Sequence, residues 1–327
     1  MHIAVTGATG HLGANLVRLL LADGHAVRAL HHSTARSEAL EGLAVERMAC
    51  DVCDPATLAP AFAGIDVVFH LAGLISIRGD PDGRVMRTNV EGTRNVVASC
   101  LDSDVGRLVH FSSIHALRTT RTDGVIDESA PPADATSFRY DQSKALGEGE
   151  VLAGVEKGLD AVILNPTGVI GPYDFVPSRA GAMLRALFSG RMPLLVEGGF
   201  DWVDARDVCR AACDAIHRGR RGERYLLSGH WASFGELGGL CGDIAKRPVR
   251  RRVVPAGIAR LGLPFSLLSA RLTGGEPLFT AESLAIVTHG SRNCSNAKAK
   301  RQLGYRPRAL AETLRDTHAW FAGRPAS

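Results

Sequence analysis

The sequence predicts an α/β fold in which a doubly wound parallel sheet carries a smaller, mostly helical C-terminal lobe. Over residues 1–166, short apolar segments alternate with segments of helical periodicity. The apolar segments are nearly continuous rather than alternating, which is typical of strands buried on both faces of a parallel sheet. A glycine-rich stretch, TGATGHLG at 6–13, joins the first apolar segment to the first helical one.

The expected elements follow one another in a regular order. Leucines at helical spacing and a terminal glycine define the first helix, over 11–24. Further helices are expected at 35–41, 55–62, 84–102 and 138–157. Strands are expected at 2–5, 26–30, 44–50, 66–72, 107–113 and 160–166. Crossovers of about 20 residues are long enough to return each strand parallel to the previous one.

This regular order ends at Pro166, where proline and glycine become frequent in PTGVIGPYDFVPSRAG. We therefore expect a dinucleotide-binding Rossmann domain over 1–166, to which residues 201–229 return with a strand at 223–229. Residues 167–200 and 230–327 are expected to form the substrate-binding lobe.

Composition limits the range of functions. The 327 residues are 45% hydrophobic, and the net charge of +4 requires neither nucleic acid nor an acidic membrane as a partner. No secretion signal precedes the first strand, and the apolar stretch at 261–270 is about half a membrane span. The cysteine count is odd, and CDVC at 50–53 has no second pair to complete a metal site. We expect a cytoplasmic protein with free thiols and no bound metal.

The glycines of the first loop, Gly7, Gly10 and Gly13, raise two alternatives: a phosphate-binding loop or a plain turn. In an open parallel sheet, ligands bind beyond the carboxyl ends of the strands, where this loop lies. Glycine lets the backbone approach a pyrophosphate, and the following helix N-terminus offers free N–H groups. This context favours the phosphate-binding loop.

The end of the second strand indicates which dinucleotide binds. An NAD site carries an acid there for the ribose 2′-hydroxyl. This chain has His31, His32 and Arg36 instead, and its first acid is Glu38. A 2′-phosphate would meet positive charge and no repulsion, so NADP(H) is favoured, with NAD(H) as the alternative.

The chemical residues are expected in two segments. YDQSK places Tyr140 and Lys144 one turn apart on the same helix face. A nearby ammonium favours the phenolate, and we expect it to lower the pKa of Tyr140. In HFSSIHA, Ser112 and Ser113 end the fifth strand at the edge where the glycine loop lies.

Together, these motifs resemble the extended short-chain dehydrogenases/reductases from residue 2 to about 322. The resemblance implies Ser113, Tyr140, Lys144 and Asn89 as the catalytic residues. It implies a cofactor site that includes Gly7, Thr9, Gly10, His11, Leu12, Gly13, Asp51, Val52, Leu71, Ala72, Gly73, Ser112, Tyr140, Lys144, Pro166, Thr167 and Val169. Helices 84–102 and 138–157 correspond to the pair that commonly forms the homodimer of this family.

Within the family, SSIHA and LGYRPRALAETLRDTHAWF resemble the dihydroflavonol-reductase-like and 3β-hydroxysteroid-dehydrogenase-like branch. This favours an NAD(P)H-dependent reductase of a ketone or aldehyde. One alternative is an epimerase or dehydratase with tightly held NAD(P), although GGFDWVDARD lacks the arginine of nucleotide-sugar epimerases. Another is a regulator that binds NADP without catalysis. The expected pocket residues are Ile75, Ser113, Ile114, His115, Tyr173 and Phe175, where His115 could equally be an ordinary loop histidine.

Overall fold

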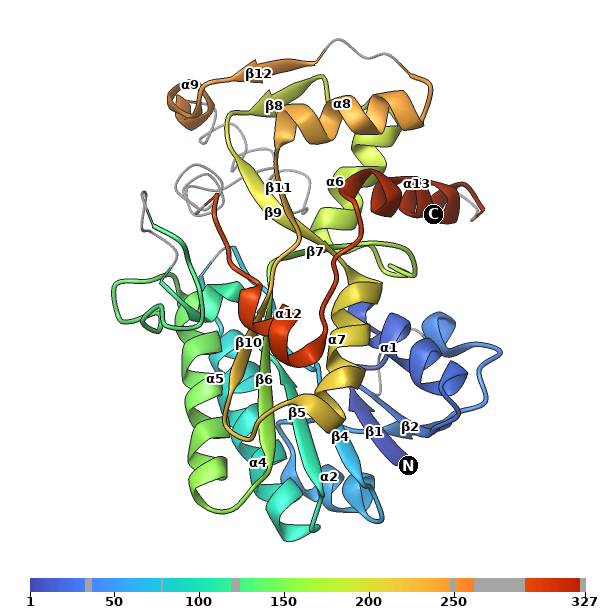
Figure 1. The fold of residues 1–327 in the computed structure, drawn as a ribbon, viewed down its shortest axis with the longest axis vertical. Coiled ribbons are helices and arrows are strands. Elements are labelled where there is room, and N and C mark those ends of the chain that lie inside the picture. Colours follow the sequence, from blue (N-terminus) through green and yellow to red (C-terminus); the bar gives the residue numbers. More distant parts are fainter. Residues whose placement is uncertain (33–36, 78, 119–123, 248–250, 262–291, 324–327) are drawn as a thin grey trace.

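The computed structural model describes residues 1–32, 37–77, 79–118, 124–247, 251–261 and 292–323. Figure 1 shows a lower domain built on a parallel sheet and an upper lobe of helices and short strands. Arg36, one of the two cations expected at the cofactor's 2′-phosphate, lies outside the described residues.

The lower domain is organised around a seven-stranded sheet in the order β10-β6-β5-β4-β1-β2-β3, and every pairing is parallel. The strands are β1 His2–Thr6, β2 Ala26–His31, β3 Glu46–Ala49, β4 Val67–His70, β5 Arg107–Phe111, β6 Ala161–Pro166 and β10 Arg224–Leu227. The chain reverses its direction of progress between β1 and β4. Such a reversal opens a crevice at the carboxyl ends of the strands.

Helices cover both faces of this sheet, because its strands are apolar on both sides. One face buries side chains of α1 His11–Ala22, α7 Ala205–Arg218 and α12 Ala297–Leu303. The other buries side chains of α2 Pro55–Phe62, α4 Gly92–Asp102 and α5 Arg139–Glu156. The predicted doubly wound fold is confirmed, including the return of β10 to the edge of the sheet beside β6.

Two of the expected helices differ in detail from the prediction. The segment expected as one helix over 84–102 contains α3 Arg84–Met86, a π-helical turn η2 Arg87–Glu91 and α4. The helix expected at 35–41 is a 3-10 turn, η1 Ser37–Leu40, in its described part. A π turn inserts an extra residue into a helix and is frequent at functional sites; here it includes Asn89.

The upper lobe contains two small sheets. One has the order β11-β9-β7 and the other pairs β12 with β8. Their strands are β7 Gly168–Ile170, β8 Leu194–Val196, β9 Gly199–Asp204, β11 His230–Ser233 and β12 Arg252–Val254. The helices are α6 Arg179–Phe188, α8 Phe234–Ile244, α9 Ala256–Leu261 and α13 Leu310–Ala322. Residues 201–204 thus lie in a small sheet, whereas α7 and β10 lie in the lower domain.

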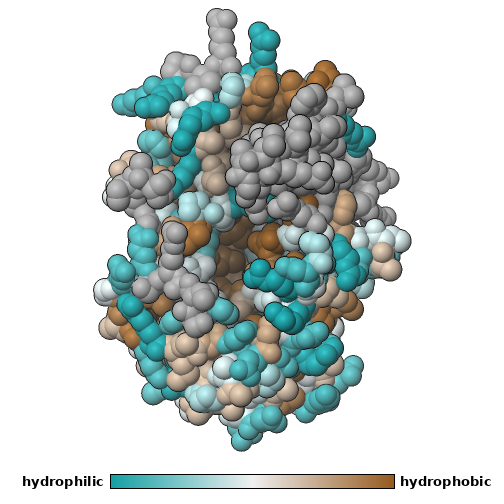
Figure 2. Space-filling model, turned by 180° about the vertical axis from the view of Figure 1, so that it is seen from behind, coloured by the Kyte–Doolittle hydropathy of each residue, from teal (hydrophilic) through white to brown (hydrophobic). Residues whose placement is uncertain are grey.

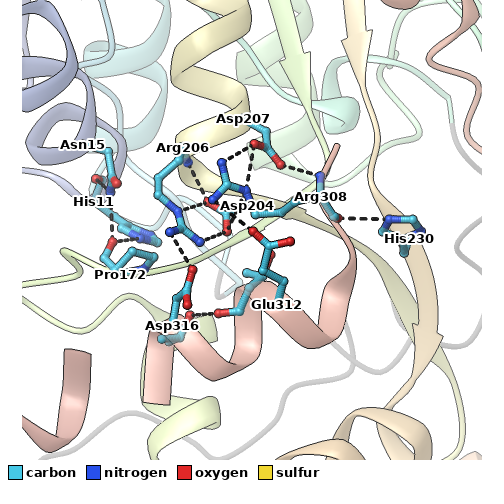
Figure 3. A network of polar contacts seen from close by, with 12 residues as sticks. His11, Asn15, Pro172, Asp204, Arg206, Asp207, His230, Arg308, Glu312 and Asp316 are labelled. Carbon is cyan, nitrogen blue, oxygen red and sulfur yellow. Dashed lines mark hydrogen bonds and ion pairs between the residues drawn. The ribbon is translucent and has the colours of Figure 1, made fainter. Parts of the chain in front are cut away.

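A network of ion pairs joins α13 to the start of α7 (Figure 3). Asp204 is fully buried, and its carboxylate contacts Arg206 at 2.7 Å and Arg308 at 3.6 Å. Arg206 also contacts Asp316 at 2.7 Å, and Arg308 contacts Asp207 at 2.8 Å. Because each arginine contacts acids of two segments, the network fixes the lobe's last helix against the lower domain.

The described residues contain no helix that is both long and apolar enough to span a bilayer. They also contain no group of three or more metal-ligating side chains. All seven cysteines are free thiols.

Candidate active site

The three glycines of the glycine loop lie in two kinds of environment, either packed against backbone atoms or beside open space. Gly7 has φ +66°, and a Cβ on it would lie 2.9 Å from the Ala72 backbone nitrogen. A Cβ on Gly13 would lie 2.2 Å from the Gly7 oxygen. A Cβ on Gly10 would meet only the Gly7 oxygen, at 3.3 Å. Gly7 and Gly13 are therefore required by the loop itself, whereas Gly10 borders open space.

That open space has an electropositive edge. Gly10 is the N-cap of α1, and no side chain caps the helix. The first-turn N–H groups of an uncapped helix attract an anion. The loop residues Thr9 and Leu12 are partly buried, as is His11. This arrangement fits a dinucleotide pyrophosphate, because a side chain at position 10 would occupy the space beside these donors.

The loop after β4 is fixed beside the glycine loop by a buried histidine. Thr6 Oγ1 lies 2.9 Å from His70 Nδ1 and accepts hydrogen bonds from the Leu71 and Ala72 amides, each at 3.1 Å. His70 Nε2 lies 3.1 Å from Thr93 Oγ1. Burial, assisted by the charge of Lys144, lowers the pKa of His70 to about 3, so this ring is neutral at physiological pH.

Ser113 and Tyr140 meet at the carboxyl end of β5. Ser113 caps the 3-10 turn η3 Ile114–Ala116, where its Oγ accepts the His115 amide hydrogen at 3.2 Å. Burial raises the pKa of Tyr140 to about 12, a hydrogen bond with Ser113 opposes the rise, and the charge of Asp141 adds to it. The expectation of a lowered pKa for Tyr140 is wrong, because burial of the phenol is the largest influence on this pKa and raises it.

Lys144 lies one turn beyond Tyr140 on α5. Its Nζ donates a hydrogen bond to the Phe111 carbonyl at 3.1 Å. Burial lowers the pKa of Lys144 to about 8, and the negative charge of Glu148 opposes this shift. A Cβ on Gly73 would lie 3.7 Å from Nζ, so the lysine reaches the loop predicted to cover the cofactor.

Glu148 is a residue that the sequence analysis missed. It is 2% exposed, contacts Arg224 of β10 at 3.0 Å, and accepts a hydrogen bond from Asn165 Nδ2 at 2.6 Å. Asn165 also donates to the Ser113 carbonyl at 2.8 Å. Tyr140, Lys144 and Glu148 are four residues apart along α5, and this spacing could have identified Glu148 as part of the same helix face.

Asn89, in the π turn η2, joins three segments around the site. Its Nδ2 donates to the Leu74 carbonyl and to Ser143 Oγ, both at 2.9 Å, and its Oδ1 accepts the Leu74 amide at 2.8 Å. The side chain therefore connects the loop after β4 to α5. It positions the loop, and the described structure places it close to Gly73, whose Cβ would lie 3.2 Å from Oδ1.

Four residues of the expected cofactor site lie at the ends of β2 and β3: His31 ends β2, His32 follows it, and Asp51 and Val52 follow β3. His32 Nε2 lies 3.8 Å from Asp51 Oδ2, and both side chains are about half exposed. Val52 is buried, and a Cβ on Gly92 would lie 2.8 Å from one of its methyl groups. The fold thus brings an acid from the neighbouring strand to a position that the sequence alone shows as acid-free.

Ser112, Pro166 and Thr167, also expected at the cofactor site, lie at the ends of β5 and β6. Thr167 donates to Asp201 Oδ1 at 2.6 Å. Ser112 Oγ is buried and has no hydrogen-bond partner among the described residues. Such a buried hydroxyl fits a polar group of a bound ligand. Val169, in β7, is partly buried against the core of the lower domain.

The loop after β7 contacts the glycine loop. The Pro172 carbonyl accepts hydrogen bonds from Asn15 Nδ2 at 2.9 Å and lies 3.0 Å from His11 Nε2 (Figure 3). Tyr173 has φ +63°, a strained conformation for a non-glycine residue, and such strain is frequent at ligand-binding sites. Its ring stacks on that of Phe175, 6.4 Å away.

The remaining expected pocket residues lie in different environments. Ile75 is 67% exposed. Ile114 is buried in a small cluster with Leu117, Ile126 and Leu226. His115 is mostly buried and lies against the ring of Tyr140.

The fold is that of a dinucleotide-binding domain, and Ser113, Tyr140 and Lys144 lie at the carboxyl edge of its sheet. A family model described as the NAD dependent epimerase/dehydratase family matches residues 3–228. The chain belongs to this family, and the resemblance to extended short-chain dehydrogenases/reductases is confirmed. It is therefore an NAD-dependent enzyme of oxidoreductase type.

Two relatives match nearly the whole chain. Sterol demethylase protein B of Methylococcus capsulatus is 35% identical over 99% of both chains. A putative dihydroflavonol 4-reductase of Synechocystis is 31% identical over 97% of this chain and 93% of its own. Among solved structures, the crystal structure of gox2253 covers 98% of this chain and 97% of its own, with 35% identity and a TM-score of 0.84.

Proposed function

We propose that this protein is an NADPH-dependent reductase of a ketone or aldehyde. The observation that supports this most directly is the convergence of Ser113, Tyr140 and Lys144 on the sheet edge that also carries the glycine loop. Relatives named as reductases include 4-hydroxy-2-methyl-3-oxo-4-farnesyl-3,4-dihydroquinoline-1-oxide ketoreductase and 2-alkyl-3-oxoalkanoate reductase.

In this proposal the bound dinucleotide supplies the hydride. The N–H groups after Gly10 would bind its pyrophosphate, and Lys144 would bind its ribose. Tyr140 donates its phenolic proton to the carbonyl oxygen, and a high pKa keeps that proton on Tyr140 until a charge develops on the substrate. Ser113 donates a hydrogen bond to the same oxygen. Lys144 stabilises the phenolate that remains.

The preference for NADP(H) rests on His31 and His32 at the end of β2, with Arg36 beyond the described part of that loop. Asp51 lies beside His32, with Nε2 and Oδ2 3.8 Å apart, so the acid at this edge faces an imidazole ring. An NAD site would instead present an acid to the ribose diol at this strand end. NAD(H) remains the alternative that the titration below distinguishes.

The substrate in this proposal is a small molecule with a sizeable apolar part. Figure 2 shows a hollow on the face opposite to that of Figure 1, with hydrophobic residues inside it. The relatives include proteins whose names refer to a sterol and to a farnesyl compound, and both compounds are large and apolar.

We also propose that the protein is a cytoplasmic homodimer that uses neither nucleic acid nor a membrane. The helix pair that the family resemblance places at a dimer interface corresponds to α4 and α5, which pack against each other within the chain. The free thiols suit a reducing compartment.

The test is NADPH oxidation measured against aromatic aldehydes, steroidal ketones and keto sugars, combined with titration of NADPH and NADH. Tyr140→Phe should lower turnover by about 10²–10⁴-fold with little change in cofactor affinity, since it removes only the proton. Lys144→Met should reduce both, and Ser113→Ala should lower turnover less than Tyr140→Phe. A substrate converted without net NADPH consumption would indicate the epimerase or dehydratase alternative. Binding without any turnover would indicate a regulator.

A further inference from the structure

A second polar pair lies directly beside Ser113 and Tyr140, formed by residues of the same two elements. His115 is in η3, and Asp141 is in the first turn of α5. Nδ1 of His115 lies 3.0 Å from Oδ1 of Asp141, and the two side chains are 17% and 16% exposed. The reductase mechanism proposed above uses neither side chain.

The imidazole ring of His115 is enclosed from several directions. It stacks on Phe200 with a centroid distance of 6.0 Å and an interplanar angle of 22°. It meets the ring of Tyr140 edge-on at 5.6 Å. The backbone of the same residue is fixed by the hydrogen bond to Ser113 Oγ. A ring confined in this way needs little further ordering to bind a substrate group.

The acid determines which nitrogen is available. Oδ1 of Asp141 is buried and faces Nδ1 of His115 at 3.0 Å, and it has no hydrogen-bond partner among the described residues. Of the two neutral tautomers, a carboxylate facing Nδ1 favours the one with its proton on Nδ1, which leaves a lone pair on Nε2. Nε2 has no hydrogen-bond partner in the described part of the chain. It is also not one of the fully buried polar atoms that lack such a partner, so it is exposed. Nε2 is therefore an accessible hydrogen-bond acceptor beside the phenol.

We propose that Nε2 of His115 accepts a hydrogen bond from a hydroxyl group on the carbon next to the reacting carbonyl, so that the substrates are hydroxy ketones. This inference rests on the proposed reductase function. The ring centroids of His115 and Tyr140 are 5.6 Å apart. At this separation, hydrogen bonds of about 2.7–3.0 Å allow the two side chains to contact oxygens on adjacent carbons of one substrate. A carboxylate at that carbon brings no proton for Nε2 and faces the charge of Asp141, so it is disfavoured.

The experiment compares a ketone with its hydroxy and carboxylate analogues. Acetophenone, 2-hydroxyacetophenone and phenylglyoxylate form the first set, and any other skeleton that the activity screen accepts can be paired in the same way. In the wild-type protein, kcat/KM should be roughly 3- to 10-fold higher for the hydroxy ketone than for the parent ketone. Phenylglyoxylate should show no such preference.

Three variants test the residues directly. His115→Phe preserves stacking on Phe200 but removes Nε2, so the ratio of hydroxy ketone to ketone should fall to about one, mainly through KM. His115→Gln retains an amide oxygen and should recover part of the ratio. Asp141→Asn should also lower the ratio, because the tautomer is no longer fixed. His217→Phe, an exposed histidine change on α7, is the matched control and should keep the wild-type ratio.

An unchanged ratio in His115→Phe would overturn the proposal, even if turnover on both ketones fell together, because that pattern indicates a packing role only. In that case the reductase function would still stand. If wild-type protein reduces no carbonyl compound of any class, the proposed function itself fails and this inference fails with it. The two failures are thus distinguishable from one set of measurements.

Discussion

Two alanine substitutions in the glycine loop should have opposite consequences. Gly10→Ala places a methyl group in open space, 3.3 Å from a single backbone oxygen. Its φ and ψ, −72° and 171°, are ordinary extended values that alanine adopts. The free energy of unfolding should fall by less than about 1 kcal/mol, as expected for the loss of a glycine N-cap. The methyl group occupies the space beside the helix N-terminus, so the dissociation constant for the dinucleotide should rise at least about tenfold.

Gly13→Ala should instead destabilise the protein. Its methyl group would lie 2.2 Å from the Gly7 oxygen and 2.8 Å from backbone atoms of Ala8. Because all of these are backbone atoms, the loop or helix must move, with a cost towards the upper end of about 1–3 kcal/mol for overpacking.

Urea denaturation without cofactor and fluorescence titration with NADPH measure the two effects separately. Gly13→Ala should be the less stable variant in urea, whereas Gly10→Ala should be the weaker binder of NADPH. A stable Gly10→Ala protein with wild-type affinity would refute the assignment of the pyrophosphate to this loop. A Gly13→Ala protein as stable as wild type would refute the packing argument.

Three further predictions follow from the buried and surface charges. Glu148→Gln should lower the free energy of unfolding by about 3 kcal/mol, because it leaves Arg224 without its acid. The control Glu150→Gln removes the acid of an exposed ion pair and should lower this free energy by less than about 1 kcal/mol. Equal effects of the two substitutions in urea denaturation would contradict this prediction. Because the folded pKa of His70 is about 3, only the unfolded chain binds this proton between pH 6.5 and 3, so stability falls as pH falls through that range. His70→Asn should therefore flatten the pH dependence of unfolding by up to about 1.4 kcal/mol per pH unit, and an unchanged slope would contradict it. His32→Asp should raise the ratio of the NADPH dissociation constant to the NADH dissociation constant, so that NADH is bound relatively more tightly. If titration shows an unchanged ratio, His32 does not contact the 2′-phosphate.

The sequence predicts the parts of this molecule that depend on local pattern. Strand and helix order, the glycine loop and the Tyr140–Lys144 spacing are all visible within short windows, and β10 could be recognised as a returning strand. The π turn around Asn89 was not predicted, since its residues have ordinary helical spacing and only the contacts with Leu74 and Ser143 distinguish it.

The buried polar contacts could not be predicted because they join residues far apart in the chain. His70 is paired with Thr6 through a separation of 64 residues. The approach of Asp51 to His32 depends on the pairing of β2 with β3, which periodicity does not specify. For the same reason, the sequence predicted the wrong direction for the pKa of Tyr140. The spacing of Lys144 was visible, but the extent of burial was not.

The most direct test of the reductase function is the fate of the transferred hydrogen. The protein is incubated with a prochiral ketone and NADPH carrying deuterium at the transferred position of C4, and both products are analysed by mass spectrometry. A reductase places one deuterium on the carbinol carbon for each NADP⁺ formed, and the rate should be strongly reduced in Tyr140→Phe. Product without deuterium, or conversion with no NADP⁺ accumulation, would contradict it.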